Sequence, residues 1–196
     1  NLRAAYHDLL DPDPGYVPNT QIELLSVSLR YYNRTNRARL EKLTFANLIS
    51  LTPIDTLIKA PSWKVSAELD TISINDCLYC RNFRLNGGAG LSGESHVLNS
   101  EVFFAIPELE LDYSHAYDEN YRFGGGITGG FLTSLTPRWK ILATGSYLRF
   151  PLGESSEAFR GFLGTRYTLQ QNLALRFDYK YREDDNEALL QIQAYF

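Results

Sequence analysis

Two cysteines that stand three positions apart are the first residues in this sequence whose spacing could carry chemistry. Cys77 and Cys80 form a CxxC pattern, which occurs in redox dithiols, in half of a zinc site and in local disulfides. A zinc site needs two more ligands, and neither His96 nor His115 stands at a suitable spacing. A redox motif opens a helix, and no helix is predicted around Cys77. We therefore expect a disulfide, formed in an oxidising compartment, and neither a metal nor a cofactor.

Serine and histidine stand next to each other twice, as Ser95-His96 and Ser114-His115. Some outer-membrane enzymes that act on lipid use a serine and a histidine carried by a β-barrel. Adjacent residues of a strand point to opposite faces, however, so neither dipeptide forms a dyad by itself. The two dipeptides also fall at opposite ends of the predicted strands. No catalytic residue is assigned, and we expect this chain alone not to be an enzyme.

Three acidic residues at alternate positions are the remaining candidates. Glu108, Glu110 and Asp112 share one face of a predicted strand. Paired carboxylates can perform acid–base catalysis or bind calcium. Arginine and lysine occur on the neighbouring predicted strands, which favours a role for the three carboxylates as partners in ion pairs.

The elements that carry these residues are β-strands, because apolar and polar residues alternate along most of the chain. In 63–70, Trp63 and Val65 oppose Lys64 and Ser66, and 173–181 alternates in the same way. In 100–113 the parity of the apolar residues changes near Pro107, which predicts a bulge there. Turn signals divide the chain into about ten strands. Their predicted spans are 21–33, 38–51, 63–73, 82–92, 100–113, 122–133, 138–149, 157–168, 172–182 and 187–196.

The first 20 residues differ from the rest, with prolines at 12, 14 and 18. We expect 1–20 to be a lead-in segment with a short helical turn around Ala4–Leu10, and 21–196 to be the β-domain. The sequence begins with Asn1 and contains no methionine, so we expect a processed protein or an excised domain. The net charge of −4 and the lack of a basic cluster argue against a nucleic-acid partner. No run of apolar residues is long enough for a transmembrane helix.

The polar face of the predicted strands carries many charges of both signs, Arg160 and Arg166 among them, which favours a membrane barrel over a soluble sandwich. Aromatic residues gather near the predicted strand ends, where interfacial belts belong. The last predicted strand ends on Phe196, a pattern typical of the signal that the barrel-assembly machinery recognises. We expect an all-β, closed antiparallel up-and-down transmembrane barrel, with a network of charges in its lumen. Its predicted members are Lys64, Glu68, Asp70, Arg84, Glu108, Glu110, Asp112, Arg176, Asp178 and Lys180.

Several stretches resemble a known family of bacterial envelope proteins. They are Ala5–Tyr16 (AYHDLLDPDPGY), 21–25 with 29–32, Leu51–Asp55 (LTPID) and the block from Cys77 to Gly90. Together they resemble the C-terminal region of that family. Its N-terminal half is similar to the periplasmic domain of Lnb-type lipoprotein N-acyltransferases, which use a Cys/His site. The resemblance implies that such chemistry lies in the attached half, and no catalytic residue carries over to this chain.

We therefore expect a barrel of the bacterial outer membrane that anchors an attached periplasmic domain, which would resemble an acyltransferase or a protease. Its partners would be outer-membrane lipid, the barrel-assembly machinery and that attached domain. One alternative is an outer-membrane barrel enzyme that acts on lipid or peptide at a rim. Another is a soluble β-barrel that binds a small apolar ligand, which requires apolar residues inside and charged residues outside.

Overall fold

One antiparallel sheet of eleven strands, in the order β1 to β11, makes up the described part of the chain. The computed structural model describes residues 2–11, 17–32, 37–55, 59–74, 77–96, 100–170, 172–182 and 185–194. The strands are Leu2–His7 (β1), Thr20–Tyr32 (β2), Arg37–Ser50 (β3), Ser62–Ile74 (β4), Cys77–Ser95 (β5), Glu101–Tyr113 (β6), Tyr121–Thr136 (β7), Trp139–Gly153 (β8), Ser156–Gln170 (β9), Leu173–Arg182 (β10) and Asp185–Ala194 (β11). The described residues contain no helix long and apolar enough to cross a membrane.

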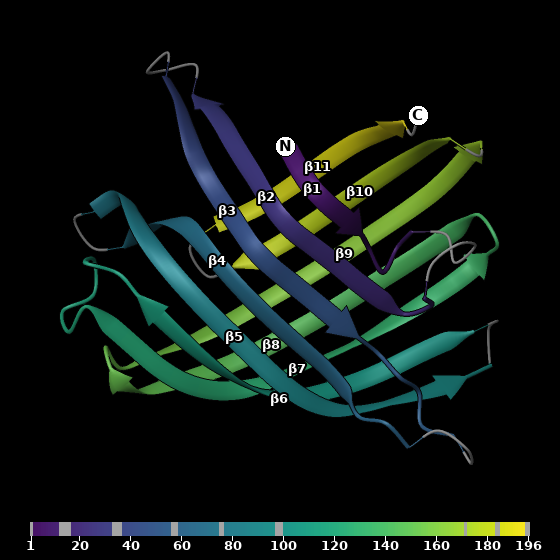
Figure 1. Cartoon of the computed structure of the whole chain (residues 1–196), viewed down its shortest axis with the longest axis horizontal. Helices are drawn as coiled ribbons and strands as arrows, with labels where there is room; N and C mark the ends of the chain where they lie inside the picture. Colours follow the sequence, from purple (N-terminus) through teal and green to yellow (C-terminus); the bar gives the residue numbers. More distant parts are fainter. Residues whose placement is uncertain are drawn as a thin grey trace.

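The sheet is an open half-barrel rather than the closed barrel of about ten strands that the sequence predicts. In the described part, no Cα of β1 or β2 lies within 8 Å of a Cα of β11. Figure 1 shows how far the sheet curls, since β2 to β5 cross over β7 to β10. The predicted all-β, antiparallel meander is confirmed, whereas the predicted strand count is wrong by one.

The additional strand is β1, which pairs with β2 from Leu2 opposite Val27 to His7 opposite Ile22. The helical turn predicted around Ala4–Leu10 is therefore wrong. Backbone pairing with the edge of β2 decides the conformation of this segment, because a short stretch with weak alternation follows its tertiary neighbours rather than its own propensity.

Two further predictions need correction inside the sheet. The predicted bulge at Pro107 is absent, since the register between β6 and β7 is uniform from Glu101 to Tyr113. Strand β5 is also longer than predicted and includes both cysteines, because its ladder with β4 continues as far as Cys77 opposite Ile74.

Glycines permit the sharp curvature in the middle of the sheet. A Cβ atom at Gly126 on β7 would run into the backbone of Tyr147 and Leu148 on β8. A Cβ at Gly90 on β5 would meet the backbone of Ala105 and Ile106 on β6 in the same way. Neighbouring strands therefore approach one another at positions where only glycine fits, which allows the sheet to bend tightly.

The two ends of the half-barrel are named here by their connections. End A carries the connection from β2 to β3 and the four later ones that leave even-numbered strands. End B carries the connections that leave odd-numbered strands, beginning with β1 to β2. A cluster of buried apolar side chains lies in the half of the interior nearest end B. Its members are Leu9, Leu10, Leu51, Val102, Phe104, Ile106, Leu132 and Leu142.

Candidate functional site: the charged interior

Strand β6 divides the interior into an apolar half and a charged half. Its even-numbered residues all point inward, and they are apolar at Val102, Phe104 and Ile106. From Glu108 onward the inward residues are acidic, with exposed fractions of 4% for Glu108, 1% for Glu110 and 0% for Asp112. The apolar residues change parity near Pro107 because the inward face of β6 changes there from apolar to acidic. The strand itself continues without a break.

Asp112 lies nearest to end A and is held by arginines from both neighbouring strands. Arg84 Nε on β5 donates a hydrogen bond of 2.8 Å to Asp112 Oδ1. Arg122 Nε on β7 donates one of 2.9 Å to Oδ2. The Arg122 guanidinium also lies 4.3 Å from the ring centroid of Phe150. In the connection beside it, burial and then the charge of Asp112 raise the pKa of the Tyr117 hydroxyl.

Glu110 links two strands that are not neighbours in the sheet. Arg160 on β9 donates two hydrogen bonds to its carboxylate, of 2.6 Å to Oε1 and 2.8 Å to Oε2. Arg84 Nε lies 3.2 Å from Glu110 Oε1. Since β7 and β8 separate β6 from β9 in the sheet, this pair spans the concave interior. Two parallel bonds to one guanidinium also fix its orientation.

Glu108 marks the boundary with the apolar half. It forms an ion pair with Lys64 on β4 and accepts hydrogen bonds from Thr128 Oγ1 at 2.6 Å and Asn86 Nδ2 at 3.0 Å. Three strands other than its own therefore supply its partners. A buried carboxylate is tolerated only when charges and hydrogen bonds compensate it in this way.

The network continues toward the first strands of the sheet through Asp70 and Glu68 on β4. Arg84 Nη1 lies 3.1 Å from Asp70 Oδ2, so one guanidinium contacts three carboxylates. Lys42 Nζ on β3 lies 2.8 Å from Glu68 Oε2. We call the whole set the acidic-strand network. It consists of Lys42, Lys64, Glu68, Asp70, Arg84, Glu108, Glu110, Asp112, Arg122 and Arg160.

A second ionic cluster lies between β10 and the turn that follows β1. Arg176 Nε donates hydrogen bonds of 2.9 and 2.8 Å to the carboxylate of Asp178 on its own strand. Its Nη1 donates one of 2.8 Å to Asp8 Oδ2 and one of 3.0 Å to the hydroxyl of Tyr6. Burial alone would raise the pKa of Asp8, but Arg176 and hydrogen bonds from Tyr6 and Leu10 outweigh it and lower that pKa. Asp8 is therefore a charged partner of Arg176.

The same turn is fixed at a second point by Asp11. Its carboxylate forms an ion pair with the buried Arg166 on β9, and its carbonyl oxygen accepts a hydrogen bond of 2.9 Å from Lys140 Nζ on β8. Between the two aspartates, Leu9 and Leu10 are 4% and 1% exposed and pack into the apolar cluster. We call residues 6–11 the clasp, because they join the first strand to β8, β9 and β10.

The predicted charge set is thus distributed over two clusters and one separate pair. Seven of its residues belong to the acidic-strand network, and Arg176 and Asp178 belong to the cluster around the clasp. Lys180 joins neither, because its half-exposed ammonium lies 3.5 Å from Glu187 on β11. The predicted set lacks several residues that these clusters contain. They are Tyr6, Asp8, Asp11, Lys42, Arg122, Lys140, Arg160 and Arg166.

For some of these missing residues, the alternation of polar and apolar residues in the sequence indicates an inward position. Arg160 and Arg166 lie on the charged polar face that the sequence predicts, although the predicted network omits them. Arg122 stands at the same parity as the inward Thr128 and Leu132 of β7. The clasp had a weaker signal, an apolar pair between two aspartates in Asp8-Leu-Leu-Asp11. Residues 8–11 lie outside any strand, so periodicity gives no information about them.

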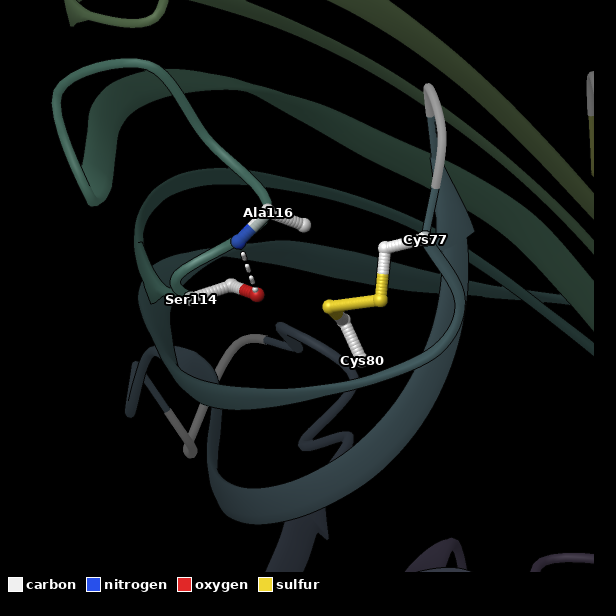
Figure 2. The surroundings of a disulfide bond; sticks show 4 residues. All are labelled: Cys77, Cys80, Ser114 and Ala116. Carbon is white, nitrogen blue, oxygen red and sulfur yellow. Dashed lines mark hydrogen bonds between the residues drawn. A yellow bond between two sulfur atoms is a disulfide. The ribbon is translucent and has the colours of Figure 1, made fainter.

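The two cysteines form a disulfide, as the sequence predicts. They lie at the beginning of β5, at end A. Figure 2 shows them beside the segment from Ser114 to Ala116. Ser114 Oγ accepts a hydrogen bond of 3.2 Å from the Ala116 amide. The disulfide therefore belongs to the rim at end A.

The candidate Ser–His residues do not meet across the sheet. Ser95 is the last residue of β5 at end B, whereas Ser114 follows β6 at end A. His115 Nδ1 lies 3.3 Å from Asn120 Oδ1, and His96 Nε2 lies 3.7 Å from Glu94 Oε1. Within the described residues, no group of three or more His, Cys, Asp or Glu side chains is arranged to hold a metal ion. The predicted assembly signal, Phe196, lies outside the described residues.

Comparison with known proteins gives one match, which covers the entire chain. A family model described as a domain of unknown function, DUF7840, matches residues 1–196. No curated protein matches the chain. No solved structure matches it either. The chain therefore belongs to the DUF7840 family.

Proposed function

We propose that this domain is a transmembrane β-barrel of the bacterial outer membrane that anchors an attached periplasmic domain. The distribution of residues on β10 is the observation that carries the proposal. Arg176 and Asp178 are 7% and 6% exposed, whereas Leu175, Phe177 and Tyr179 are 39%, 37% and 38% exposed. A domain that folds in water buries its apolar side chains and leaves its charges outside. This strand does the opposite.

The same inversion extends around the outside of the sheet. Leu29, Leu91 and Leu109 are between 59% and 64% exposed, although they lie on β2, β5 and β6. Exposed apolar patches larger than a few hundred Å² mark surfaces that contact a membrane or another protein. An apolar band that spans most strands of one sheet is best matched by the hydrocarbon of a bilayer.

Aromatic side chains border this band near both ends. Tyr113 and Tyr121 lie at end A, with exposed fractions of 50% and 41%. Trp63 and Trp139 lie at the beginnings of β4 and β8, at end B, and each is 40% exposed. Tyrosine and tryptophan favour the two interfaces of a membrane, where the ring is in contact with lipid and the polar atom with water.

The dimensions of the sheet also suit a membrane. Strands β2 to β9 contain between 13 and 19 residues. A tilted strand crosses the hydrocarbon core with ~9–11 residues. In lipid an unpaired sheet edge leaves backbone groups unsatisfied at several kcal/mol each, so insertion requires closure of the half-barrel. The contact of Arg176 with Tyr6 and Asp8 supports closure, because it already joins the first strand to β10.

The partners of the inward carboxylates support the proposed role as an anchor. The inward carboxylates are engaged by arginine or lysine in both clusters, which favours a structural role over acid–base catalysis. The resemblance to envelope proteins with an acyltransferase-like N-terminal half supports an attached periplasmic domain. Outer-membrane lipid and the barrel-assembly machinery complete the proposed partners. A soluble barrel for an apolar ligand would need the reverse arrangement of faces.

Reconstitution into vesicles tests this proposal. The urea-unfolded chain is diluted into phospholipid vesicles, and insertion is measured by flotation with the lipid in a density gradient. We expect the floated protein to resist protease and to migrate faster on a gel when it is not boiled, as closed membrane barrels do. The proposal is wrong if the chain folds in buffer without lipid or detergent and stays at the bottom of the gradient.

A further inference from the structure

The apolar cluster near end B extends across the interior from one side of the sheet to the other. Leu51 follows β3, whereas Leu132 and Leu142 lie on β7 and β8. Figure 1 shows β3 crossing over β7 and β8, so these side chains enter the interior from opposite sides. All members of the cluster are between 1% and 9% exposed. Apolar side chains therefore form a layer across the interior at this level.

Two members of this layer, Leu9 and Leu10, come from the clasp rather than from a strand. A Cβ atom at Gly164 on β9 would lie 2.9 Å from Leu10 Cδ1, so Leu10 rests directly against the backbone of that strand. The ring of Phe162, also on β9, packs against the same cluster. The clasp thus lies across the inner face of the sheet, where its two leucines complete the apolar layer.

The clasp is a compact turn that its own two carboxylates hold together. Asp8 Oδ1 accepts a hydrogen bond of 2.9 Å from the Leu10 amide, and Asp11 Oδ2 accepts one of 2.9 Å from the Asp8 amide. The other oxygens face the strands, because Asp8 Oδ2 contacts Arg176 and Asp11 Oδ1 contacts Arg166. Each aspartate therefore binds the turn with one oxygen and a strand with the other, which fixes the shape and the position of the clasp together.

We propose that the clasp is a plug that closes the lumen toward end B, so that the barrel carries neither ions nor solutes across the membrane. This inference rests on the membrane function proposed above. Passages lined by polar groups conduct ions, whereas apolar constrictions exclude water and thereby close a channel. The acidic-strand network is polar, so the apolar layer is the barrier, and Leu9 and Leu10 are the part of it that the clasp supplies.

The way in which the plug is attached makes it separable from the sheet. Side-chain contacts join it to the later strands, through Asp8 with Arg176 and through Asp11 with Arg166. Lys140 Nζ adds one bond to the carbonyl oxygen of Asp11. The ladders of the sheet do not depend on these contacts, since β1 pairs with β2 and β8 to β10 pair with one another. Loss of the two carboxylate charges should therefore release the plug and leave the sheet intact.

Conductance of planar phospholipid bilayers tests the plug. The test variant is Leu9→Ser/Leu10→Ser, which places hydroxyl groups in the apolar layer and lets water enter it. The control is Val17→Ser/Ile54→Ser, which makes the same kind of change in the connections at end B. Val17 and Ile54 are 69% and 42% exposed and lie outside the apolar cluster. Flotation with vesicles and the shift of the unboiled protein on a gel confirm that each variant inserts.

We expect the parent and the control to leave the bilayer silent and the test variant to raise its conductance at least about tenfold. Ion flow through the parent would overturn the proposal, because the lumen would then be open with the clasp in place. A test variant that inserts and is as silent as the parent would also overturn it, because the rest of the apolar layer would then close the lumen without the clasp.

A second variant, Asp8→Asn/Asp11→Asn, tests the plug with its leucines intact and decides the matter if the serine variant does not insert. It removes the two charges that attach the clasp and leaves the side-chain volumes almost unchanged. Asp178→Asn is its control, because Asp178 contacts Arg176 but not the clasp. We expect the double variant to conduct and the control to stay silent. Equal conductance of the two would contradict the proposal.

Flotation of the parent is a separate readout that distinguishes this inference from the membrane function. A parent that floats with the vesicles and conducts ions contradicts the plug alone. A parent that does not float contradicts the membrane function and, with it, the plug.

Discussion

Arg176 on β10 donates a hydrogen bond of 2.8 Å to Asp8, a residue 168 positions earlier in the chain. Both side chains are buried, and the bond joins the turn after the first strand to the strand before the last one. Because no ladder joins β1 to β11 in the described residues, side chains rather than backbone pairing connect the two sides of the open sheet. The clasp thus joins the first strand to strands on the opposite side of the half-barrel.

We expect Asp8→Asn to loosen the clasp. The change removes the charge from a buried, charge-assisted hydrogen bond, at a cost of about 1.5–3 kcal/mol in the free energy of unfolding. Asp178→Asn is the matched control, because Asp178 contacts the same guanidinium but not the clasp. Urea unfolding in micelles measures both costs, and a Leu10→Cys substitution in each background reports the burial of the clasp.

We expect the thiol at position 10 to react with maleimide slowly in the parent and in Asp178→Asn, and quickly in Asp8→Asn. Equal labelling in the two aspartate variants would show that the bond between Asp8 and Arg176 does not hold the clasp in place.

Acidification should remove the contribution of Asp8. Its pKa is lower in the folded protein than the ordinary value of 3.8, so its ionisation stabilises the fold. That contribution is fully present above about pH 5 and is lost as the pH falls through the folded-state pKa. Tyr6, His7, Asp11, Arg176 and Asp178 surround the group, so the comparison is made with Asp8→Asn to separate its share. The difference in unfolding midpoint between parent and variant should shrink below about pH 4, and a difference that does not depend on pH would contradict the assignment.

Periodicity in the sequence is sufficient to predict the strands that have one apolar and one polar face. In Trp63–Asp70 the apolar residues Trp63 and Val65 are 40% and 43% exposed, and Glu68 and Asp70 are 8% and 5% exposed. The side-chain period of a strand is 2, so an alternating stretch fixes which residues share a face. Which of the two faces points outward then depends on whether water or lipid surrounds the sheet.

Features that depend on distant partners could not be predicted in this way. The partner of Glu110 is Arg160, which periodicity places on an inward face but not opposite that carboxylate. Strand β1 pairs with the edge of β2, and periodicity gives no information about whether the two edges of the described sheet meet. Such features depend on the tertiary arrangement, which local propensity does not determine.

Glycine at position 126 should be essential for the bend between β7 and β8. A Cβ there meets the carbonyl oxygen of Tyr147, and backbone atoms cannot move aside as a flexible side chain can. We expect Gly126→Ala to lower the free energy of unfolding by about 1–3 kcal/mol, the usual range for overpacking. Gly145→Ala is the control, because a Cβ at Gly145 has nothing within 4 Å. Urea midpoints that fall equally in both variants would contradict the role of Gly126 in the bend.

The disulfide at end A should contribute little to the fold. Cys77 and Cys80 are three positions apart, so the bond closes a very short loop and removes little entropy from the unfolded chain. We expect Cys77→Ala/Cys80→Ala to insert into vesicles and to lose about 2 kcal/mol or less, the low end for disulfides. Intact mass without reductant should show the parent two hydrogens lighter than after reduction. A double variant that cannot insert would show that the rim depends on this bond.

The face of β10 is the most direct test of the central claim that the apolar side of this sheet contacts lipid. Phe177→Arg places a charge on that side, where arginine costs ~2–4 kcal/mol at the bilayer midplane. Lys180→Gln removes a charge that is half-exposed and lies near Glu187, so it should cost much less. Folding of both variants into phospholipid vesicles is measured by flotation and by the shift of the unboiled protein on a gel. The account predicts that Phe177→Arg fails to insert while Lys180→Gln inserts like the parent. If Phe177→Arg inserts as well as the parent and Lys180→Gln does not, the faces are reversed and the claim is wrong.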